Sequence, residues 1–190
     1  SNNSLTPFSG LTPDVVLDAL EAVGFRGDGR LTQLNSFENR VFQVMLEDGQ
    51  AVVTKFYRPN RWSDEQIAEE HAFSLEALAD DVPVVAPLRL QSPQPSSPVA
   101  LSPAATQSLA IWTSGAGCWR FAVWPRRAGR TPELEDEQVL RRLGGCLARL
   151  HNVGSRSRFE YRHTLRVVED AQAAVDLIES LSLVPPDQED

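Results

Sequence analysis

The first half of the chain alternates apolar and polar residues with the period of two that is typical of β-strands. Three such runs occupy residues 31–34, 40–46 and 52–57, and the last is rich in β-branched and aromatic residues. A polar connector at 35–39 and the Asp48-Gly49 dipeptide, which has turn chemistry, separate the runs. The pattern therefore predicts an antiparallel meander of three strands.

Lys55 is the one charged residue in the middle of the third predicted strand. Because successive side chains point to opposite faces of a strand, Lys55 shares a face with Val53 and Tyr57. A lysine in this place is either an edge residue with a solvated ammonium group or a cation aimed into a cleft that holds a negative partner. The strand alone leaves both alternatives open.

Apolar residues with a helical period predict two helices in the same half of the chain. One begins at Thr12-Pro13-Asp14 and ends at Gly24, and the other begins with the capping box Ser63-Asp64-Glu65-Gln66 and ends near Asp80. On the second helix Glu70 lies at the border of the apolar face, whereas Glu69 points nearly the opposite way. If one of these two acids turns toward the sheet, we expect it to be Glu70.

Further strands and one irregular segment are expected after the second helix. Residues 84–90 predict a strand, and residues 109–112 and 119–124 predict two more, which Ser114-Gly115-Ala116-Gly117 joins. Between them, residues 91–108 are rich in Pro, Ser, Ala and Gln and have neither a helical nor a strand period. We expect this segment to be a mobile surface loop.

The last part of the chain predicts two amphipathic helices, over residues 139–150 and 166–183. Gly154 lies just past the first, and Pro185-Pro186 ends the second. The Gly144-Gly145 pair inside the first costs about 1–2 kcal/mol relative to two alanines, which indicates a close neighbour. If nothing covers the two apolar faces, they form an exposed patch, so we expect the chain to be marginally stable or to self-associate.

Composition narrows the class of protein. With 190 residues, 42% of them apolar and 23% charged, the chain has the values of a globular domain with a real core. Its net charge of −8 argues against a partner that is nucleic acid or an anionic membrane. Cys118 and Cys146 are too few and too far apart for a metal site or a disulfide scaffold. Without a leader or an apolar run of membrane length, the chain is expected to be cytoplasmic.

In this order the elements resemble the amino-terminal lobe of the protein-kinase-like fold. Four runs carry a narrower resemblance, namely LNSFENRV at 34–41, KFYRP at 55–59, Arg61-Trp62 and Glu69-Glu70-His71. They are similar to the bacterial stress response kinase A family, which is related to the aminoglycoside and choline phosphotransferases. The resemblance covers roughly residues 11–154 and implies an α+β fold with an antiparallel sheet of about five strands and a packed helix. Residues 1–125 would form the ATP-binding lobe, and residues 126–190 the hinge and the first helices of an incomplete helical lobe.

By position, the resemblance implies an ATP site. Lys55 resembles the strand lysine that binds the α- and β-phosphates, and Glu70 resembles its partner on the helix. The connector 35–39 resembles the nucleotide-covering turn but lacks the Gly-rich pattern of protein kinases, so side chains and backbone N–H groups of a polar turn would make its phosphate contacts. Segment 121–125 resembles the hinge whose backbone takes the adenine edge. The residues implied are Ser36 and Asn39 in the turn, Lys55, Glu70, and Val123 and Trp124 in the hinge.

The catalytic loop of the family is missing from the chain. That loop carries a His-x-Asp motif with an Asn five residues after the Asp, and a second Asp follows for Mg²⁺. None of the three histidines, His71, His151 and His163, is followed two residues later by an aspartate. We therefore expect the catalytic Asp and the Mg²⁺ ligands beyond Asp190, and we expect this chain alone to be the inactive ATP-binding portion of a longer kinase.

Three classes of function stay open. The first is an ATP- and Mg²⁺-dependent Ser/Thr protein kinase of the stress-response type. The second is a small-molecule phosphotransferase, similar to the aminoglycoside and choline kinases. The third is a non-catalytic module that binds a nucleotide or a protein partner. The amino-terminal lobe cannot separate the first two classes, because the acceptor site lies in the other lobe.

Overall fold

The computed structural model describes residues 7–105, 107–115 and 117–180. The chain divides into two compact units, Ser1–Glu160 and Tyr161–Asp190. In the second unit, α4 (Val167–Ser180) is the predicted helix as far as Ser180, while residues 181–183 and Pro185-Pro186 lie outside the described residues. The lobe boundary expected between residues 125 and 126 rests on the resemblance to kinases and not on this division into compact units, so it stays a prediction.

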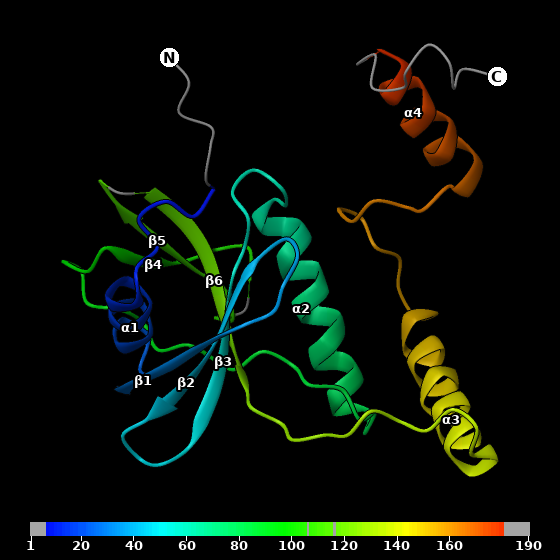
Figure 1. Cartoon of the computed structure of the whole chain (residues 1–190), viewed down its shortest axis with the longest axis horizontal. Helices are drawn as coiled ribbons and strands as arrows, with labels where there is room; N and C mark the ends of the chain where they lie inside the picture. The colour runs from blue at the N-terminus through cyan, green and yellow to red at the C-terminus, as the bar shows by residue number, and fades with distance from the viewer. Residues whose placement is uncertain (1–6, 106, 116, 181–190) are drawn as a thin grey trace. The chain divides into compact units, whose positions relative to one another are not determined.

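Among the described residues, six antiparallel strands form one sheet in the first unit (Figure 1). The predicted meander is present as β1 (Gly27–Leu34), β2 (Arg40–Leu46) and β3 (Ala51–Phe56), with β1 beginning at Gly27 rather than at residue 31. β6 (Gly117–Pro125) pairs with β3, and β5 (Ala110–Ser114) and β4 (Val99–Leu101) follow at the far edge. The spatial order β1-β2-β3-β6-β5-β4 places the lysine strand in the middle of the sheet.

Helix α1 (Pro13–Ala22) closes one face of the sheet, which we call the core face. α1 begins as its sequence predicts, because Thr12 Oγ1 accepts a hydrogen bond from the Val15 N–H at 3.3 Å and proline occupies the first turn. The ring of Phe56 stacks on that of Phe121 at a centroid distance of 5.1 Å. The buried core-face residues of the strands include Phe42, Val44, Leu46, Val52, Phe56, Phe121 and Val123.

Helix α2 (Asp64–Ala79) lies on the opposite face and covers only part of it (Figure 1). The predicted capping box is present, since Ser63 Oγ accepts from the Gln66 N–H at 3.2 Å and Gln66 Oε1 accepts from the Ser63 N–H at 3.0 Å. Ile67 packs with Tyr57, Leu109 and Ala122. Over β2 and β3 the alternate residues stay half-exposed, so we call this the open face; they are Val41, Gln43, Met45, Ala51, Val53 and Lys55.

The strand predicted over residues 84–90 is wrong. The segment forms only isolated bonds, in which the Leu88 and Leu90 N–H groups donate to Val123 O and Gln107 O. Pro83 and Pro87 have no N–H to donate, which prevents a continuous ladder.

The Pro- and Ser-rich segment 91–108 has more regular structure than predicted. β4 lies inside it and pairs with β5. Ser102 and Ser108 are each only 2% exposed. Ser102 Oγ donates to Asp64 Oδ2 at 2.6 Å, and Ser108 Oγ lies 2.9 Å from His71 Nδ1. The prediction of an irregular segment is therefore wrong for β4, and polar side chains also anchor the segment to α2.

Helix α3 (Glu137–Gly154) confirms the helix predicted around 139–150 but is covered only near its end. Val153 packs with Ala77 and Val82, whereas Leu140, Leu143 and Leu147 are 48%, 38% and 54% exposed. A Cβ added at Gly144 or Gly145 would meet no described atom within 4 Å. The close neighbour expected for this glycine pair is thus not among the described residues.

No helix within the described ranges is both long and apolar enough to cross a membrane.

Candidate functional site

Lys55 lies on the open face of β3, where a carboxylate and two aromatic rings flank its ammonium group. The Nζ atom is 3.7 Å from Glu70 Oε1, 4.5 Å from the centre of the Tyr57 ring and 4.8 Å from that of the Trp124 ring. The Lys55 side chain is 23% exposed. Of the two alternatives for this lysine, the structure shows the cation that faces a negative partner and keeps some access to solvent.

Lys55 is also the single lysine of the sequence, in which the other 17 of 18 basic residues are arginines. Arginine presents a planar fork of donors, whereas lysine presents a compact charge with three rotatable donors. Lys55 is thus the one position of these 190 residues that presents a compact ammonium group.

The choice between the two acids of α2 is confirmed. Glu70 turns toward β3 and meets Lys55, whereas Glu69 Oε1 accepts a hydrogen bond from the Glu160 backbone N–H. Adjacent helical residues differ by about 100° in direction, so only one of the two can reach the strand. Because the Glu70 side chain is 37% exposed, the ion pair contributes at most about 1 kcal/mol to stability.

A second layer of side chains, centred on His71, lies behind Lys55. His71 Nε2 is 3.0 Å from Tyr57 Oη, and its ring meets the Trp124 ring edge-on at a centroid distance of 5.7 Å. Burial lowers the pKa of His71 to about 4; the Glu70 carboxylate opposes this shift and the Lys55 ammonium adds to it. At neutral pH His71 is therefore uncharged, with one ring nitrogen donating and the other accepting.

This second layer was not predicted as part of the site. The only signals in the sequence are that Tyr57 shares a strand face with Lys55 and that His71 directly follows Glu70. The third member, Ser108, lies in a segment that composition alone marks as irregular. Its role depends on a contact between distant parts of the chain, which local patterns do not report.

The predicted covering turn at 35–39 is anchored to the segment that follows β3. Asn39 Oδ1 accepts a hydrogen bond from the Arg58 N–H at 3.1 Å, and Glu38 Oε1 accepts one from Arg61 Nε at 2.6 Å. The register pairs Val41 with Lys55, which places the turn at the Lys55 end of the sheet. Ser36 and its neighbour Phe37 are exposed in this turn. The turn is therefore held near Lys55 while its tip stays open.

The two predicted hinge residues lie in β6 and face opposite sides of the sheet. Trp124 pairs with Val53 on the open face, beside Lys55. Val123 is fully buried on the core face, and its carbonyl oxygen accepts a hydrogen bond from the Leu88 N–H at 2.7 Å. The open face thus offers a half-exposed apolar strip, Val53 and Trp124, next to the Lys55 ammonium group. The Val123 carbonyl, by contrast, already has a backbone partner. After Pro125 the chain leaves the sheet without regular structure over residues 126–133.

The described residues do not form a metal site. Within the described ranges, no group of three or more His, Cys, Asp or Glu residues could hold a metal ion. Both cysteines are free, and Cys118 is exposed.

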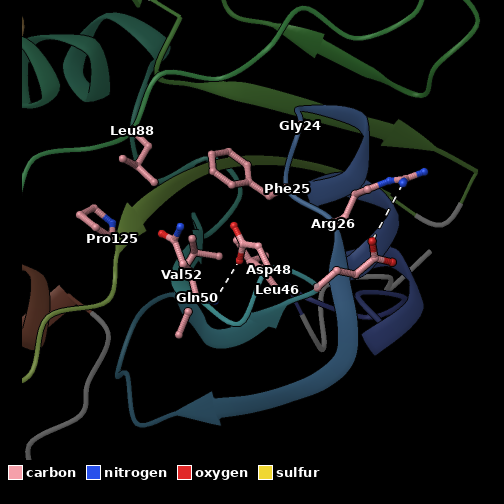
Figure 2. A pocket seen from close by; sticks show the side chains of 11 residues that line it. Gly24, Phe25, Arg26, Leu46, Asp48, Gln50, Val52, Leu88 and Pro125 are labelled. Atoms are coloured by element: carbon pink, nitrogen blue, oxygen red, sulfur yellow. Dashed lines mark hydrogen bonds and ion pairs between the residues drawn. The ribbon is translucent and has the colours of Figure 1, made fainter.

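A groove of about 440 Å³ lies at the other end of β3 from Lys55. Figure 2 shows the side chains that line it. Its walls combine apolar side chains with polar groups that pair with one another: Arg26 Nη1 lies 4.0 Å from Glu47 Oε2, and Asp48 Oδ1 accepts from the Gln50 N–H at 2.9 Å. None of the six predicted site residues lines it. The groove is thus separate from the candidate site around Lys55.

The fold has a counterpart among solved structures. A structure of amicoumacin kinase hAmiN in complex with AMP-PNP, Ca²⁺ and Ami is similar, with a TM-score of 0.60 over 90% of this chain and 54% of that chain. The two sequences are 17% identical, so the likeness shows the fold alone. The fold expected from the sequence, a kinase-like lobe followed by helices, is confirmed.

Residues 30–187 match the phosphotransferase enzyme family, and the chain belongs to this family. It is similar to stress response kinase A of Escherichia coli (strain K12), with 38% identity over 184 residues that make up 97% of this chain and 51% of the relative. It is also similar to the serine/threonine protein kinase RdoA of Salmonella typhimurium (strain LT2), with 35% identity over 187 residues, or 98% and 52% of the two chains. The chain spans about half the length of the curated relatives it matches, and the resemblance noted from its sequence is confirmed.

Proposed function

We propose that the complete protein transfers the γ-phosphoryl group of ATP and that this chain holds the nucleotide. The observation that carries the proposal is the Lys55–Glu70 pair on the open face of the sheet. A partly exposed ammonium group beside a carboxylate keeps its positive charge and can still meet the α- and β-phosphates. Lys55 would bind these phosphates, and Glu70 would hold Lys55 in position.

The rest of the nucleotide would be held by groups that surround this pair. The polar turn would cover the phosphates with the Ser36 hydroxyl and with backbone N–H groups, while the Asn39 side chain holds the turn against Arg58. The apolar strip beside Trp124 would take the flat adenine ring, and the backbone of segment 121–125 its polar edge. Because Val123 O already accepts from Leu88, we expect the polar contacts at Trp124 and beyond.

The chemical step needs groups outside these 190 residues. We infer that the catalytic Asp and the ligands of Mg²⁺ follow Asp190 in the complete protein, since none of the three histidines here begins a His-x-Asp motif and the chain spans about half of its relatives. This chain contributes the position and the electrostatic environment of the nucleotide. Alone it is expected to bind ATP without transferring phosphate. A cytoplasmic location, where ATP is available, belongs to the same proposal.

The acceptor we propose is a serine or threonine of a protein substrate. The relatives with 35–38% identity include one named as a serine/threonine protein kinase, and this identity is well above the 17% shared with the antibiotic kinase. A small-molecule acceptor is the alternative that the antibiotic kinase favours. Radiolabelled ATP offered to the complete protein with a protein mixture, and separately with aminoglycosides and choline, distinguishes the two by which acceptor gains label.

The nucleotide site itself is tested by calorimetric titration of the complete protein with Mg-ATP. Replacing Lys55 by alanine should weaken binding by about 10- to 100-fold, because a hydrogen bond to a charged group contributes about 1.5–3 kcal/mol. Arg26→Ala removes the same charge from the rim of the separate groove and serves as the matched control. Equal affinities for the two variants would contradict the assignment of Lys55.

A further inference from the structure

The Lys55 ammonium group depends on side chains that the proposed nucleotide contacts do not include. The rings of Tyr57 and Trp124 lie 4.5 Å and 4.8 Å from Nζ, distances at which a cation is attracted to an aromatic face. His71 touches both rings, through the hydrogen bond to Tyr57 Oη and the edge-on contact with Trp124. A movement of His71 would therefore move both aromatic walls of the lysine.

His71 is in turn held from its other side. Its Nδ1 atom lies 2.9 Å from Ser108 Oγ, and the His71 side chain is 2% exposed. Rotation of the imidazole would leave buried nitrogen atoms without partners, which costs about 1–3 kcal/mol for each such group. The ring is thus fixed in one orientation between Tyr57 and Ser108.

The segment that supplies Ser108 is tied to α2 at a second point. Asp64, at the start of α2, binds both Ser102 Oγ and Arg120 Nε. Asp64 and His71 lie about two turns apart on the same side of the helix. Two contacts therefore attach α2, the helix that carries Glu70, to this segment: Asp64 meets Ser102, and His71 meets Ser108. Ile67, which packs on the sheet, lies between Asp64 and His71 along the helix.

We propose that His71 is a positioning residue for Lys55, and that Ser108 fixes His71, so that segment 91–108 helps to set the geometry of the lysine. His71 acts on Lys55 through the Tyr57 and Trp124 rings and does not itself meet the nucleotide. The expected effect of His71 on ATP binding rests on the proposed function. The expected effect of His71 on the position of the Lys55 ammonium group does not.

Two amide replacements of His71 separate its two hydrogen bonds. The amide of asparagine reaches about as far as Nδ1, and that of glutamine about as far as Nε2. His71→Gln therefore retains the bond to Tyr57, whereas His71→Asn retains only the bond to Ser108. Tyr57→Phe removes the same bond from the other partner, and its loss of a single oxygen makes it the variant of choice if His71→Asn does not fold. His151→Asn, at an exposed histidine of α3, is the matched control.

The first readout is the acetylation of Lys55 in the complete protein by a trace of acetic anhydride over a pH series, followed by peptide mass spectrometry. The peptide that contains Lys55, the single lysine of these 190 residues, is followed by its mass. The second readout is the dissociation constant for Mg-ATP. Loosened aromatic walls stabilise the ammonium form less, so His71→Asn and Tyr57→Phe should raise the acetylation rate and the dissociation constant by about three- to tenfold. His71→Gln and Ser108→Ala each lose the bond between residues 71 and 108 but keep the bond to Tyr57, so both should fall between the wild-type values and those of His71→Asn.

A purely structural role of His71 predicts a different result. In that case the variants lower the melting temperature only. The acetylation rate of Lys55 and the dissociation constant for Mg-ATP, both measured well below the melting temperature, then equal those of the control His151→Asn. This outcome overturns the inference. If the wild-type protein does not bind ATP but Lys55 acetylation still responds more strongly to His71→Asn than to His71→Gln, the proposed function fails and the positioning of Lys55 stands.

Discussion

The two faces of the sheet put neighbouring residues of β3 to opposite uses. On the core face, Val52, Thr54 and Phe56 are 4% exposed or less. On the open face, Val53 and Lys55 remain half-exposed under a helix that covers only part of the strand. The larger buried apolar cluster lies on the face that α1 closes, whereas the other face keeps a charged group accessible. Substitutions on the two faces should therefore affect different properties.

The largest expected effect on stability comes from the core face. Phe56→Ala removes a fully buried ring that stacks on Phe121, and we expect it to lower the free energy of unfolding by about 3–5 kcal/mol. Its neighbour Lys55→Ala should lower that free energy by no more than about 1 kcal/mol, because it removes a partly exposed ion pair. Urea unfolding followed by tryptophan fluorescence measures both. A loss for Lys55→Ala as large as that for Phe56→Ala would show that the two faces do not divide stability in this way.

A change of pH should act on the open face through His71. The pKa of this histidine is lowered by burial from 6.5 to about 4, so the unfolded chain binds its proton first as the pH falls. The contribution of His71 to stability is fully present above pH 6.5 and is lost between pH 6.5 and pH 4, by about 3 kcal/mol at most. Urea midpoints over this range should fall less steeply for His71→Gln than for the wild type. Parallel pH profiles for the two proteins would contradict the burial of an uncharged histidine.

Which parts of this arrangement can be predicted depends on whether they are local in sequence. Strand alternation is local, and it correctly predicts that Lys55 and Phe56 lie on opposite faces of the sheet. The direction of Glu70 follows from the helical period and is also predicted. By contrast, the contact between His71 and Ser108 joins residues far apart in the chain, and the period of neither segment reports it.

The errors have equally specific causes. The apolar run at 84–90 resembles a strand, but Pro87 interrupts its donors, and the run makes only isolated bonds to its neighbours. β4 spans only Val99–Leu101, which is too short for a period of two to be recognised. The Gly144-Gly145 pair has no close neighbour among the described residues. The self-association expected from the apolar faces of the last two helices stays a prediction.

The smallest effects compare the caps of the two helices that cover the two faces. Thr12→Ala and Ser63→Ala each remove a side-chain acceptor from a helix N-terminus, and each should lower the free energy of unfolding by about 1 kcal/mol. Only Ser63 caps the helix that carries Glu70 and His71, so only Ser63→Ala should also weaken Mg-ATP binding. Local fraying of the helix that costs the site a few tenths of a kcal/mol corresponds to an affinity that is about two- to threefold lower. Urea unfolding and calorimetric titration of the same two variants make the comparison. If both caps changed ATP affinity equally, nucleotide binding would depend on overall stability rather than on the position of α2, and the division of labour between the two faces would not hold.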